Sequence, residues 1–288
     1  MSDPASPVSD PALGEIPPIP RSRRGDWTWE LVSQYPKQGE WTEEQYLSRS
    51  FEGLVEFVHG VLDFVDPLYP PEEGGPPRSR RGDWTWELVT EFPRQGQWTE
   101  VEYSFLTEEV RAELNSGCLE FLPMPTWIHA WIIDYLHDAL KLFVRARNLG
   151  KTGTNSVRVR TTPGHVREPD VVYLKSERIP NPRQPSNGAD LVMEVVSEGF
   201  GDRKQDLEEK RVEYAEAGIP EYWIVDPETE SITILILPVD ASEYAVHGEF
   251  RPGQQATSVL SPGFSVDVAA CFAAGNPPQE SSDSSPVA

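Results

Sequence analysis

The sequence contains little cysteine, no long apolar segment and a marked shortage of positive charge. Its two cysteines, Cys118 and Cys271, lie far apart and form no CxxC pair, so neither a disulfide framework nor a cysteine-based zinc site is predicted. A reducing, cytoplasmic compartment fits this usage. The longest apolar run, Ile232 to Val239, is too short to span a bilayer. Residues 1–20 carry prolines and acids where a signal peptide would be apolar. We therefore expect a soluble protein that is not exported and does not bind membranes.

The charge balance argues against a typical nucleic-acid-binding domain. The chain of 288 residues has a net charge of −22, and residues 101–275 hold 27 acidic and 16 basic residues, which is half of that excess. Binding to nucleic acid usually needs a basic surface because phosphate contacts supply much of the affinity. Any such contact here must be local, with divalent cations bridging protein and phosphate. An equally weighted alternative is that the basic residues only form a solvated face and the charged edges of strands. The candidate residues are Arg145, Arg147, Lys151, Arg158, Arg160 and Arg167.

The N-terminal third contains an internal repeat. Residues 21–32 and 78–89 share the same twelve letters, RSRRGDWTWELV, at an offset of 57, and weaker similarity continues to about residue 68 and residue 125. Two copies are too few for a solenoid. Each copy has a capping-box pattern that predicts a helix start, at Thr42 and at Thr99. A hairpin is predicted to follow, turning at His59-Gly60 in the first copy and at residues 115–117 in the second.

The repeat and the composition predict how the chain is divided. We expect an N-terminal disordered tail, an extra copy of the repeat, a Pro/Gly-rich linker, one domain with the second copy at its start, and a C-terminal disordered tail. The paired tryptophans of each copy are more typical of packing than of base stacking. Nearly identical copies can exchange within a chain or between chains, which is a route to a homodimer. The corresponding boundaries are 1–20, 21–68, 69–77, 78–274 and 275–288.

The remainder of the chain predicts an α/β (α+β) domain. Apolar residues recur with helical period from Trp127 to Asn148, with Gly150 as the stop signal. A second helix is predicted from about Arg203 to Ala217. Strands are predicted from β-branched and apolar runs at residues 156–161, 170–174, 191–197, 221–226 and 231–237.

Two carboxylates are predicted to meet in this domain. Glu194 lies inside an apolar strand, where an unpaired charge is costly, and Asp170 lies at the start of a neighbouring predicted strand. Two converging carboxylates suit Mg²⁺ or Mn²⁺, which prefer oxygen ligands and keep several waters. The main-chain carbonyl of Val195 is a candidate third ligand. Such a cation activates water and neutralises charge on a phosphate.

Several motifs together resemble one family. They are Pro169-Asp170, the stretch from Glu194 to Ser197, the Asp206, Lys210 and Tyr214 series, and GIPEYWIVDP at residues 218–227. These resemble the Uma-two (DUF820-like) family of endonucleases in the PD-(D/E)XK nuclease superfamily, over roughly residues 82–272. The resemblance implies a restriction-endonuclease-like mixed sheet flanked by helices, with Asp170 and Glu194 as the metal-binding acids.

One position departs from the superfamily pattern. A lysine two residues after the strand acid is expected to orient or deprotonate the attacking water, but Val196 stands there. The resemblance implies that Lys210, on the following helix, has taken this role. The alternative is an exposed lysine that pairs with Asp206 at i,i+4, which stabilises a helix by only about 0.3 to 0.5 kcal/mol.

Four other residues are weaker site candidates. Ser197 and Tyr214 are placed to hold Glu194 or the lysine, although capping and packing are common roles for such residues. His129 lies near the start of the first long helix, where it lines the site or is merely structural. Glu120 ends a predicted strand and is a candidate extra acid.

The function predicted from the sequence is metal-dependent endonucleolytic hydrolysis of phosphodiester bonds, with DNA as the expected substrate. Asp170 and Glu194 are expected to hold Mg²⁺ or Mn²⁺ while Lys210 assists the attacking water. The alternative is a catalytically inactive binding or interaction module with a nuclease fold, because Val196 replaces the usual lysine and a fold alone guarantees no activity.

Overall fold

The computed structural model describes residues 22–49, 55–64, 79, 81–106, 110–122, 125–155, 157–179, 184–197 and 208–276. The predicted N-terminal tail, the predicted linker and most of the predicted C-terminal tail lie outside these residues. Contacts divide the chain into two units, Met1–Gln95 and Gly96–Ala288. The predicted division by repeat copies stays a prediction.

The first unit is built from short elements around a small apolar core. Its helices are α1 (Trp29–Val32), α2 (Glu43–Leu47) and α3 (Trp86–Thr90), and its strands are β1 (Val55–Val58) and β2 (Val61–Phe64). The capping box at Thr42 is present, with Gln45 as its reciprocal partner. The predicted hairpin is confirmed, because β1 pairs antiparallel with β2 around His59 and Gly60, both of which have positive φ.

The second unit begins with the same kind of helix and hairpin. Thr99 caps α4 (Glu100–Ser104) through a capping box with Glu102. Strands β3 (Ala112–Asn115) and β4 (Cys118–Phe121) pair antiparallel, as predicted. They form one edge of a five-stranded sheet of order β4-β3-β7-β6-β9. Its other strands are β6 (Val159–Arg160), β7 (His165–Arg167) and β9 (Ser186–Asn187).

A six-stranded mixed sheet forms the centre of the second unit. Its order is β13-β12-β11-β10-β8-β5, and within it only the β10–β11 pair is parallel. A third, two-stranded sheet consists of β14 (Gln255–Thr257) and β15 (Ser265–Asp267). The strands of the large sheet are β5 (Gly150–Thr154), β8 (Val171–Lys175), β10 (Leu191–Val195), β11 (Glu221–Asp226), β12 (Ser231–Ile236) and β13 (Ala245–Phe250).

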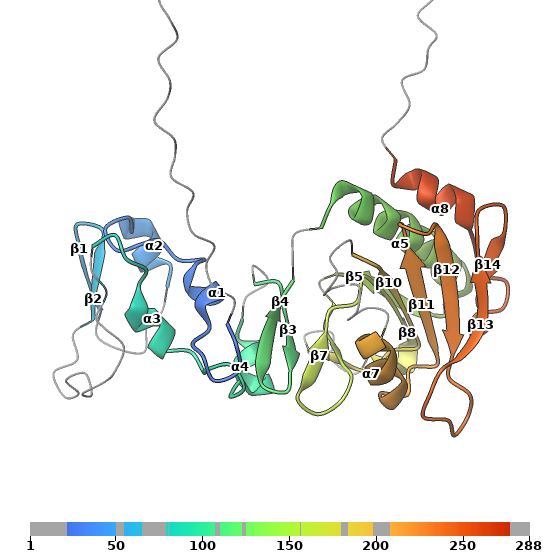
Figure 1. Ribbon diagram of the computed structural model, residues 1–288, viewed down its shortest axis with the longest axis horizontal. Coiled ribbons are helices and arrows are strands. Elements are labelled where there is room, and N and C mark those ends of the chain that lie inside the picture. The colour runs from blue at the N-terminus through green and yellow to red at the C-terminus, as the bar shows by residue number, and fades with distance from the viewer. Residues whose placement is uncertain are drawn as a thin grey trace, which may run out of the picture. The chain divides into compact units, whose positions relative to one another are not determined.

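Helices cover both faces of the large sheet (Figure 1). One core joins α5 (Trp127–Arg147) and α8 (Val268–Ala274) to alternate strand residues, among them Met193 and Trp223. The opposite core joins α7 (Lys210–Glu216) to the intervening residues, such as Val192 and Tyr222. Because successive strand side chains point to opposite faces, Glu194 falls on the α7 side. The mixed, helix-flanked α/β architecture predicted from the sequence is confirmed.

Several element boundaries differ from the predictions, and helix α7 is described only from Lys210 to Glu216 of the range predicted from about Arg203 to Ala217. Helix α5 ends at Arg147 because Asn148 adopts the left-handed conformation. Gly150, predicted as the stop, belongs instead to β5, where a Cβ would lie 2.1 Å from the carbonyl oxygen of Leu174. The strand predicted at 156–161 is reduced to the two residues of β6.

Two further findings concern helix length and the cysteines. No helix in the described part of the chain is both long and apolar enough to cross a membrane. Cys118 and Cys271 are free thiols, and burial raises the pKa of Cys271 to about 12.

Core packing by α5 yields the first prediction. Leu136 is fully buried in the core between α5 and the sheet, whereas Leu142 on the same helix is 71% exposed. Leu136→Ala is expected to lower the free energy of unfolding by about 2 to 5 kcal/mol, because it removes apolar contacts and leaves a cavity. Leu142→Ala, the matched control, is expected to change it by less than about 0.5 kcal/mol. Urea denaturation of both variants measures this, and equal losses would contradict the assignment of the buried face.

Candidate active site

The strand register brings Asp170 and Glu194 to opposite positions. Strands β8 and β10 pair antiparallel with Val171 opposite Met193, so the next opposite positions are Asp170 and Glu194. Cβ atoms at such positions lie about 5 Å apart. Glu194 follows the alternation that points toward α7, since Val192 belongs to the core on that side, whereas the Asp170 carboxylate contacts Val195 N and His129 of α5. Asp170 directly precedes β8 and Glu194 lies in β10, so each acid is one residue beyond the last pair of the β8–β10 ladder.

Glu194 is buried and held by two side chains from α7. Its side chain is 2% exposed, and Tyr214 donates its hydroxyl hydrogen to Oε1 over 2.6 Å. The Nζ atom of Lys210 lies 3.2 Å from Oε2. Burial, reinforced by the charge of Glu194, raises the pKa of Tyr214 well above its ordinary value, so the phenol stays a hydrogen-bond donor. These contacts compensate a carboxylate that would otherwise be costly to bury.

Lys210 is buried, which disagrees with the alternative sequence interpretation of an exposed lysine paired with Asp206. It is 6% exposed and it pairs with Glu194 rather than projecting into solvent. Asp206, the partner considered from the i,i+4 spacing, lies outside the described residues. The expectation that Tyr214 holds Glu194 is met by the hydrogen bond between them. Ser197 follows β10 and is half-buried.

Asp170 and the carbonyl of Val195 converge on one nitrogen atom. Val195 N donates to Asp170 Oδ2 over 2.8 Å. The Nε2 atom of His129 lies 2.9 Å from the carbonyl oxygen of Val195 and 3.3 Å from Asp170 Oδ2. A carbonyl oxygen only accepts hydrogen bonds, so Nε2 of His129 carries a hydrogen. Two of the three predicted metal ligands thus point their oxygen atoms at the same place.

His129 is positioned by the start of α5. Thr126 caps the helix by accepting from His129 N over 3.2 Å. Burial lowers the pKa of His129, but the hydrogen bond and charge of Asp170 outweigh it, so the pKa lies above its usual value. Its Nδ1 atom is buried without a hydrogen-bond partner among the described residues. His129 is therefore part of this site, as one sequence interpretation expected.

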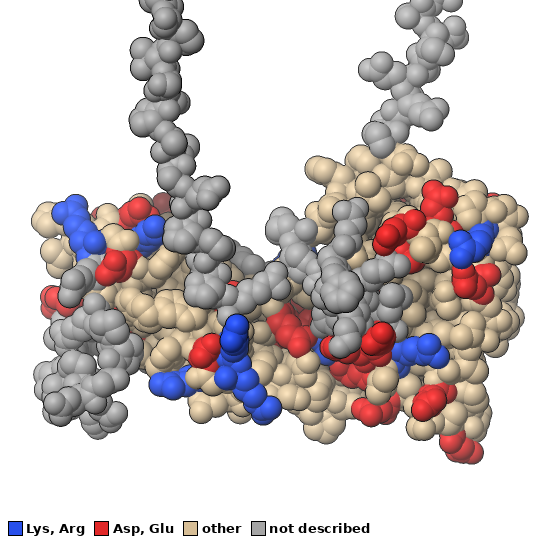
Figure 2. Space-filling view, in the orientation of Figure 1, with Lys and Arg blue, Asp and Glu red and all other residues tan. Residues whose placement is uncertain are grey.

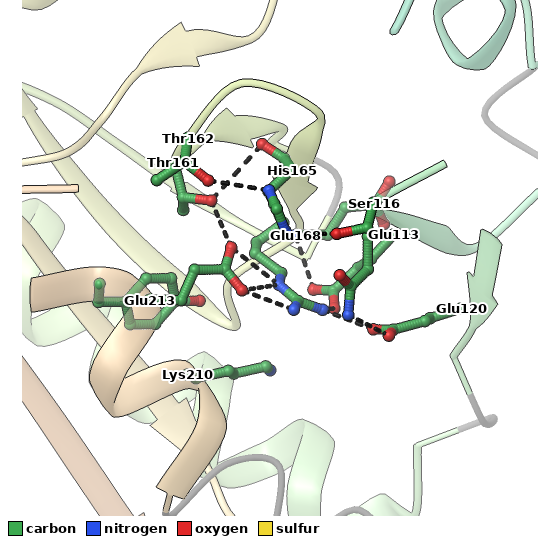
Figure 3. Close-up of polar contacts among 12 residues, drawn as sticks. Glu113, Ser116, Glu120, Thr161, Thr162, His165, Glu168, Lys210 and Glu213 are labelled. Carbon is green, nitrogen blue, oxygen red and sulfur yellow. Dashed lines mark hydrogen bonds and ion pairs between the residues drawn. The ribbon is translucent and has the colours of Figure 1, made fainter. Parts of the chain in front are cut away.

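A second group of buried charges lies beside the site and was not predicted. Arg167 is 1% exposed and contacts three carboxylates at 2.9, 2.6 and 2.6 Å, from Glu113, Glu120 and Glu213 respectively. Figure 3 labels Glu113, Glu120 and Glu213 together with Lys210, which extends from α7 into the same region. Glu120, a candidate extra acid in the sequence, is thus a partner of Arg167.

Glu113 is a fully buried carboxylate in this group. Its Oε1 accepts from Glu168 N over 2.9 Å, and its Oε2 accepts from Arg167 Nη1. Burial alone would raise the pKa of Glu113, but the positive charges of Lys210 and Arg167 hold this pKa below its ordinary value. Lys210 therefore acts on two buried acids, Glu194 by direct contact and Glu113 by its charge.

The basic residues considered for phosphate contacts fall into three classes. Arg167 is buried, so its predicted surface role is wrong. Arg158 and Arg160 pair with Glu168 and Glu100 at 3.2 and 2.6 Å. On the face in Figure 2, basic side chains of the described residues are interspersed with acidic ones rather than continuous. The exposed members of the set are Arg145, Arg147 and Lys151.

The donor set at Asp170 suits a hard cation. No group of three His, Cys, Asp or Glu side chains among the described residues is arranged to hold a metal ion. Mg²⁺ needs no such cage, because it is bound through one or two carboxylates and keeps several waters. Asp170, Glu194 and the Val195 carbonyl supply two carboxylates and a neutral oxygen, and two of these already converge on His129 Nε2. The residues present fit the predicted ion.

The residues missed by sequence reasoning had only weak signals. Glu113 lies between Ala112 and Leu114 in β3, and Arg167 ends β7 before Glu168, so neither charge stands inside a long apolar run as Glu194 does. Glu213 follows Lys210 by three residues on the same helix. Their mutual contacts join segments 46 to 54 residues apart, a separation that a single sequence does not reveal.

Comparison with known proteins identifies a family and a fold. A family model named Uma2, described as "Putative restriction endonuclease", matches residues 97–269. Five chains of known structure match. One is described as a "putative nuclease belonging to DUF820 from Anabaena variabilis"; it is 17% identical, with a TM-score of 0.51, and the match covers 62% of this chain and 99% of that one. No curated protein matches significantly. At this identity the structural likeness establishes the fold.

The buried charge of Glu113 predicts a specific pH dependence. A carboxylate with a lowered pKa stabilises the fold above its unfolded pKa of about 4.3, and this contribution is lost as the pH falls through the lower, folded value. Glu113→Gln is expected to cost about 3 kcal/mol of unfolding free energy at pH 7, and the difference from wild type should shrink toward pH 3. Urea titrations across this range measure it.

Glu243, an exposed residue, provides the matched control. Glu243→Gln should change the unfolding free energy little at any pH, because an exposed charge away from partners contributes within about 0.5 kcal/mol. A Glu113→Gln penalty that stays constant from pH 7 to pH 3 would show that the ionised form of Glu113 is not what stabilises the fold.

Proposed function

This chain belongs to the Uma2 family, and from that premise we propose that it is a metal-dependent endonuclease that hydrolyses phosphodiester bonds of DNA. The observation that carries the proposal is the buried Glu194, one residue beyond the Met193–Val171 pair as Asp170 is, and contacted by Lys210 at 3.2 Å. A carboxylate with a purely structural role would cost less free energy at the surface, where water solvates its charge. The presence of this buried carboxylate near a second acid and a lysine supports a catalytic role.

We assign cation binding to Asp170, Glu194 and the carbonyl of Val195, with Mg²⁺ or Mn²⁺ as the ion. Such an ion, when bound, lowers the pKa of a water ligand and neutralises negative charge on the phosphate. Asp170, Glu194 and the Val195 carbonyl would hold the ion through their oxygen atoms. Tyr214 supports this by fixing one oxygen of Glu194 through a 2.6 Å hydrogen bond. Val195 N likewise fixes one oxygen of Asp170.

Lys210 takes the role of the lysine that is absent at Val196. Val196 is 3% exposed and packs in the apolar core on the α7 side, so it offers no polar group. Lys210 reaches Glu194 from α7 and is itself nearly buried. A positive charge in such a poorly solvated place interacts more strongly with an anion than it would in water. In our proposal Lys210 orients the attacking water and stabilises the charge that develops on the phosphate.

The family description supports a nucleic acid as the substrate, and the net charge of −22 limits how it is bound. An acidic protein gains little from nonspecific attraction to phosphates. Binding therefore depends on local contacts and on the bound cation. Weak binding to bulk DNA in the absence of a divalent cation follows from this charge balance.

Cleavage and metal binding test the three assigned residues separately. Asp170→Asn and Glu194→Gln are expected to lose binding of Mn²⁺, measured by calorimetry, together with cleavage of plasmid, linear duplex or single-stranded DNA. Lys210→Met is expected to keep Mn²⁺ binding and to lower the cleavage rate about 100-fold or more, because it removes one positioned group that acts in the transition state. The matched control at an exposed position is Glu177→Gln, which should leave both measurements unchanged.

The same measurements decide against the proposal if it is wrong. Cleavage that survives Lys210→Met removes the role of that lysine and leaves the metal site. Mn²⁺ binding that survives both Asp170→Asn and Glu194→Gln rejects the metal site itself. Wild-type protein that neither binds Mn²⁺ nor cuts any of the substrates is the inactive binding module that Val196 suggested.

A further inference from the structure

The first unit contains parts of both repeat copies. Here the opening segments are residues 22–35 of the first copy and residues 79–92 of the second, which carry the shared GDWTWELV sequence. The first hairpin is β1 and β2 of the first copy. Both opening segments and the first hairpin belong to Met1–Gln95. The contacts among them are therefore contacts between copies of the same sequence.

Backbone hydrogen bonds join each opening segment to the other copy. Gly82 N donates to Gln38 O over 2.7 Å, and Gln38 N donates to Asp83 O over 2.9 Å. The positions 57 residues away make the reciprocal pair. Gly25 N donates to Gln95 O over 2.6 Å, and Gln95 N donates to Asp26 O over 3.0 Å. Each copy thus gives its opening segment to the other and receives the other's in return.

Side chains repeat the same reciprocal pattern. Thr85 donates its hydroxyl hydrogen to the carbonyl of Pro36 over 3.3 Å, and Thr28 donates to Pro93 over 3.1 Å. Cations stack on tryptophans in the same way. Lys37 Nζ lies 5.1 Å from the ring of Trp84, and the guanidinium carbon of Arg94 lies 4.3 Å from the ring of Trp27.

One contact joins two equivalent residues directly. The ring centroids of Trp29 and Trp86, which occupy the same position in the two copies, are 4.1 Å apart in an edge-on arrangement. In a two-fold, isologous interface, residue i contacts j while j contacts i, and residues on the axis contact their own equivalents. The first unit shows this geometry within one chain.

The surface that receives the second opening segment is well packed. Leu88 is 3% exposed and forms a cluster with Trp41 and Leu62, which are 3% and 2% exposed. Trp41 Nε1 donates to Thr85 Oγ1 over 3.2 Å. The Gln38 side chain fixes the position of Leu62 in this surface through two 2.8 Å hydrogen bonds to the Leu62 backbone. The segment is thus recognised by shape, backbone pairing and one indole hydrogen bond.

We propose that the surface formed by Gln38, Trp41 and Leu62 is a docking site for the opening segment of this repeat, and that it accepts that segment from a second copy of the chain. The full chain fills the surface with its own residues 79–92. Because the interface is isologous, the same contacts made between two chains give a two-fold dimer. This inference is independent of the nuclease proposal.

Cutting the full chain between the copies turns the internal contact into one between separate chains. A protease site inserted between Gly74 and Gly75 yields residues 1–74 and 75–288 after cleavage. The two pieces are expected to stay together on gel filtration. A fluorescently labelled 1–74 piece, taken from a second cut preparation, is expected to exchange into the complex. Separation of the pieces after cutting, or failure of the labelled piece to enter, would overturn the proposal.

Two variants tie the association to the named contacts. Leu88→Ala, verified as folded before cutting, is expected to weaken association at least about 30-fold, the equivalent of the 2 kcal/mol or more lost on truncating a buried leucine. Thr85→Val keeps the size of the side chain and removes its hydrogen bonds, so it should weaken association while preserving the fold. Leu47→Ala is the matched control, since Leu47 is 70% exposed in the same unit. Equal association of the Leu88 and Leu47 variants would overturn the proposal.

Discussion

Burial of the Glu194 carboxylate is the constraint on which the geometry of the second unit depends. An ionised carboxyl group at 2% exposure in a central strand requires a cation and hydrogen-bond donors within reach. Lys210 and Tyr214 supply them from a single helix. Helix α7 must therefore pack over β10, and the parallel pairing of β10 with β11 returns the chain to the sheet after that helix.

The same helix extends the charge compensation to a second cluster. Glu213 of α7 binds Arg167, which also binds the fully buried Glu113. Positive charge from Lys210 and Arg167 keeps the pKa of Glu113 low. Acidic and basic groups therefore alternate from β10 through α7 to β7 and β3. Breaking one member leaves an uncompensated charge in the interior, and this couples the site to the fold around it.

The sequence predicted those parts of the fold that have a local pattern. The apolar period of α5, the runs that form β8, β10, β11 and β12, and the two capping boxes are local signals. Strand β5 was missed because GKTGT has no apolar alternation; it forms because it pairs with β8 along its whole length. Glu194 was singled out because a charge in an apolar strand is conspicuous, and Asp170 because it comes at the start of a neighbouring strand. Arg167 was misread as a surface residue because its partners are distant in sequence.

For the repeat, too, the sequence predicted the equivalent segments but not which of them contact each other. The shared sequence predicted that the two opening segments are equivalent and can exchange. It left open whether exchange occurs within a chain or between chains, because both use the same contacts. The reciprocal bonds of Gln38 and Gln95 place the exchange inside the first unit. The tryptophans of the repeat serve this packing, with Trp29 against Trp86.

The central claim is that Asp170, Glu194 and the Val195 carbonyl hold one divalent cation. The most direct test is anomalous scattering from crystals of the wild-type protein soaked in Mn²⁺. The account predicts a single strong peak within about 2.1 Å of an oxygen atom from each of these three groups, with the His129 Nε2 contact to Val195 O displaced. A strong peak elsewhere, or no peak at this position when Mn²⁺ is in excess, would contradict it.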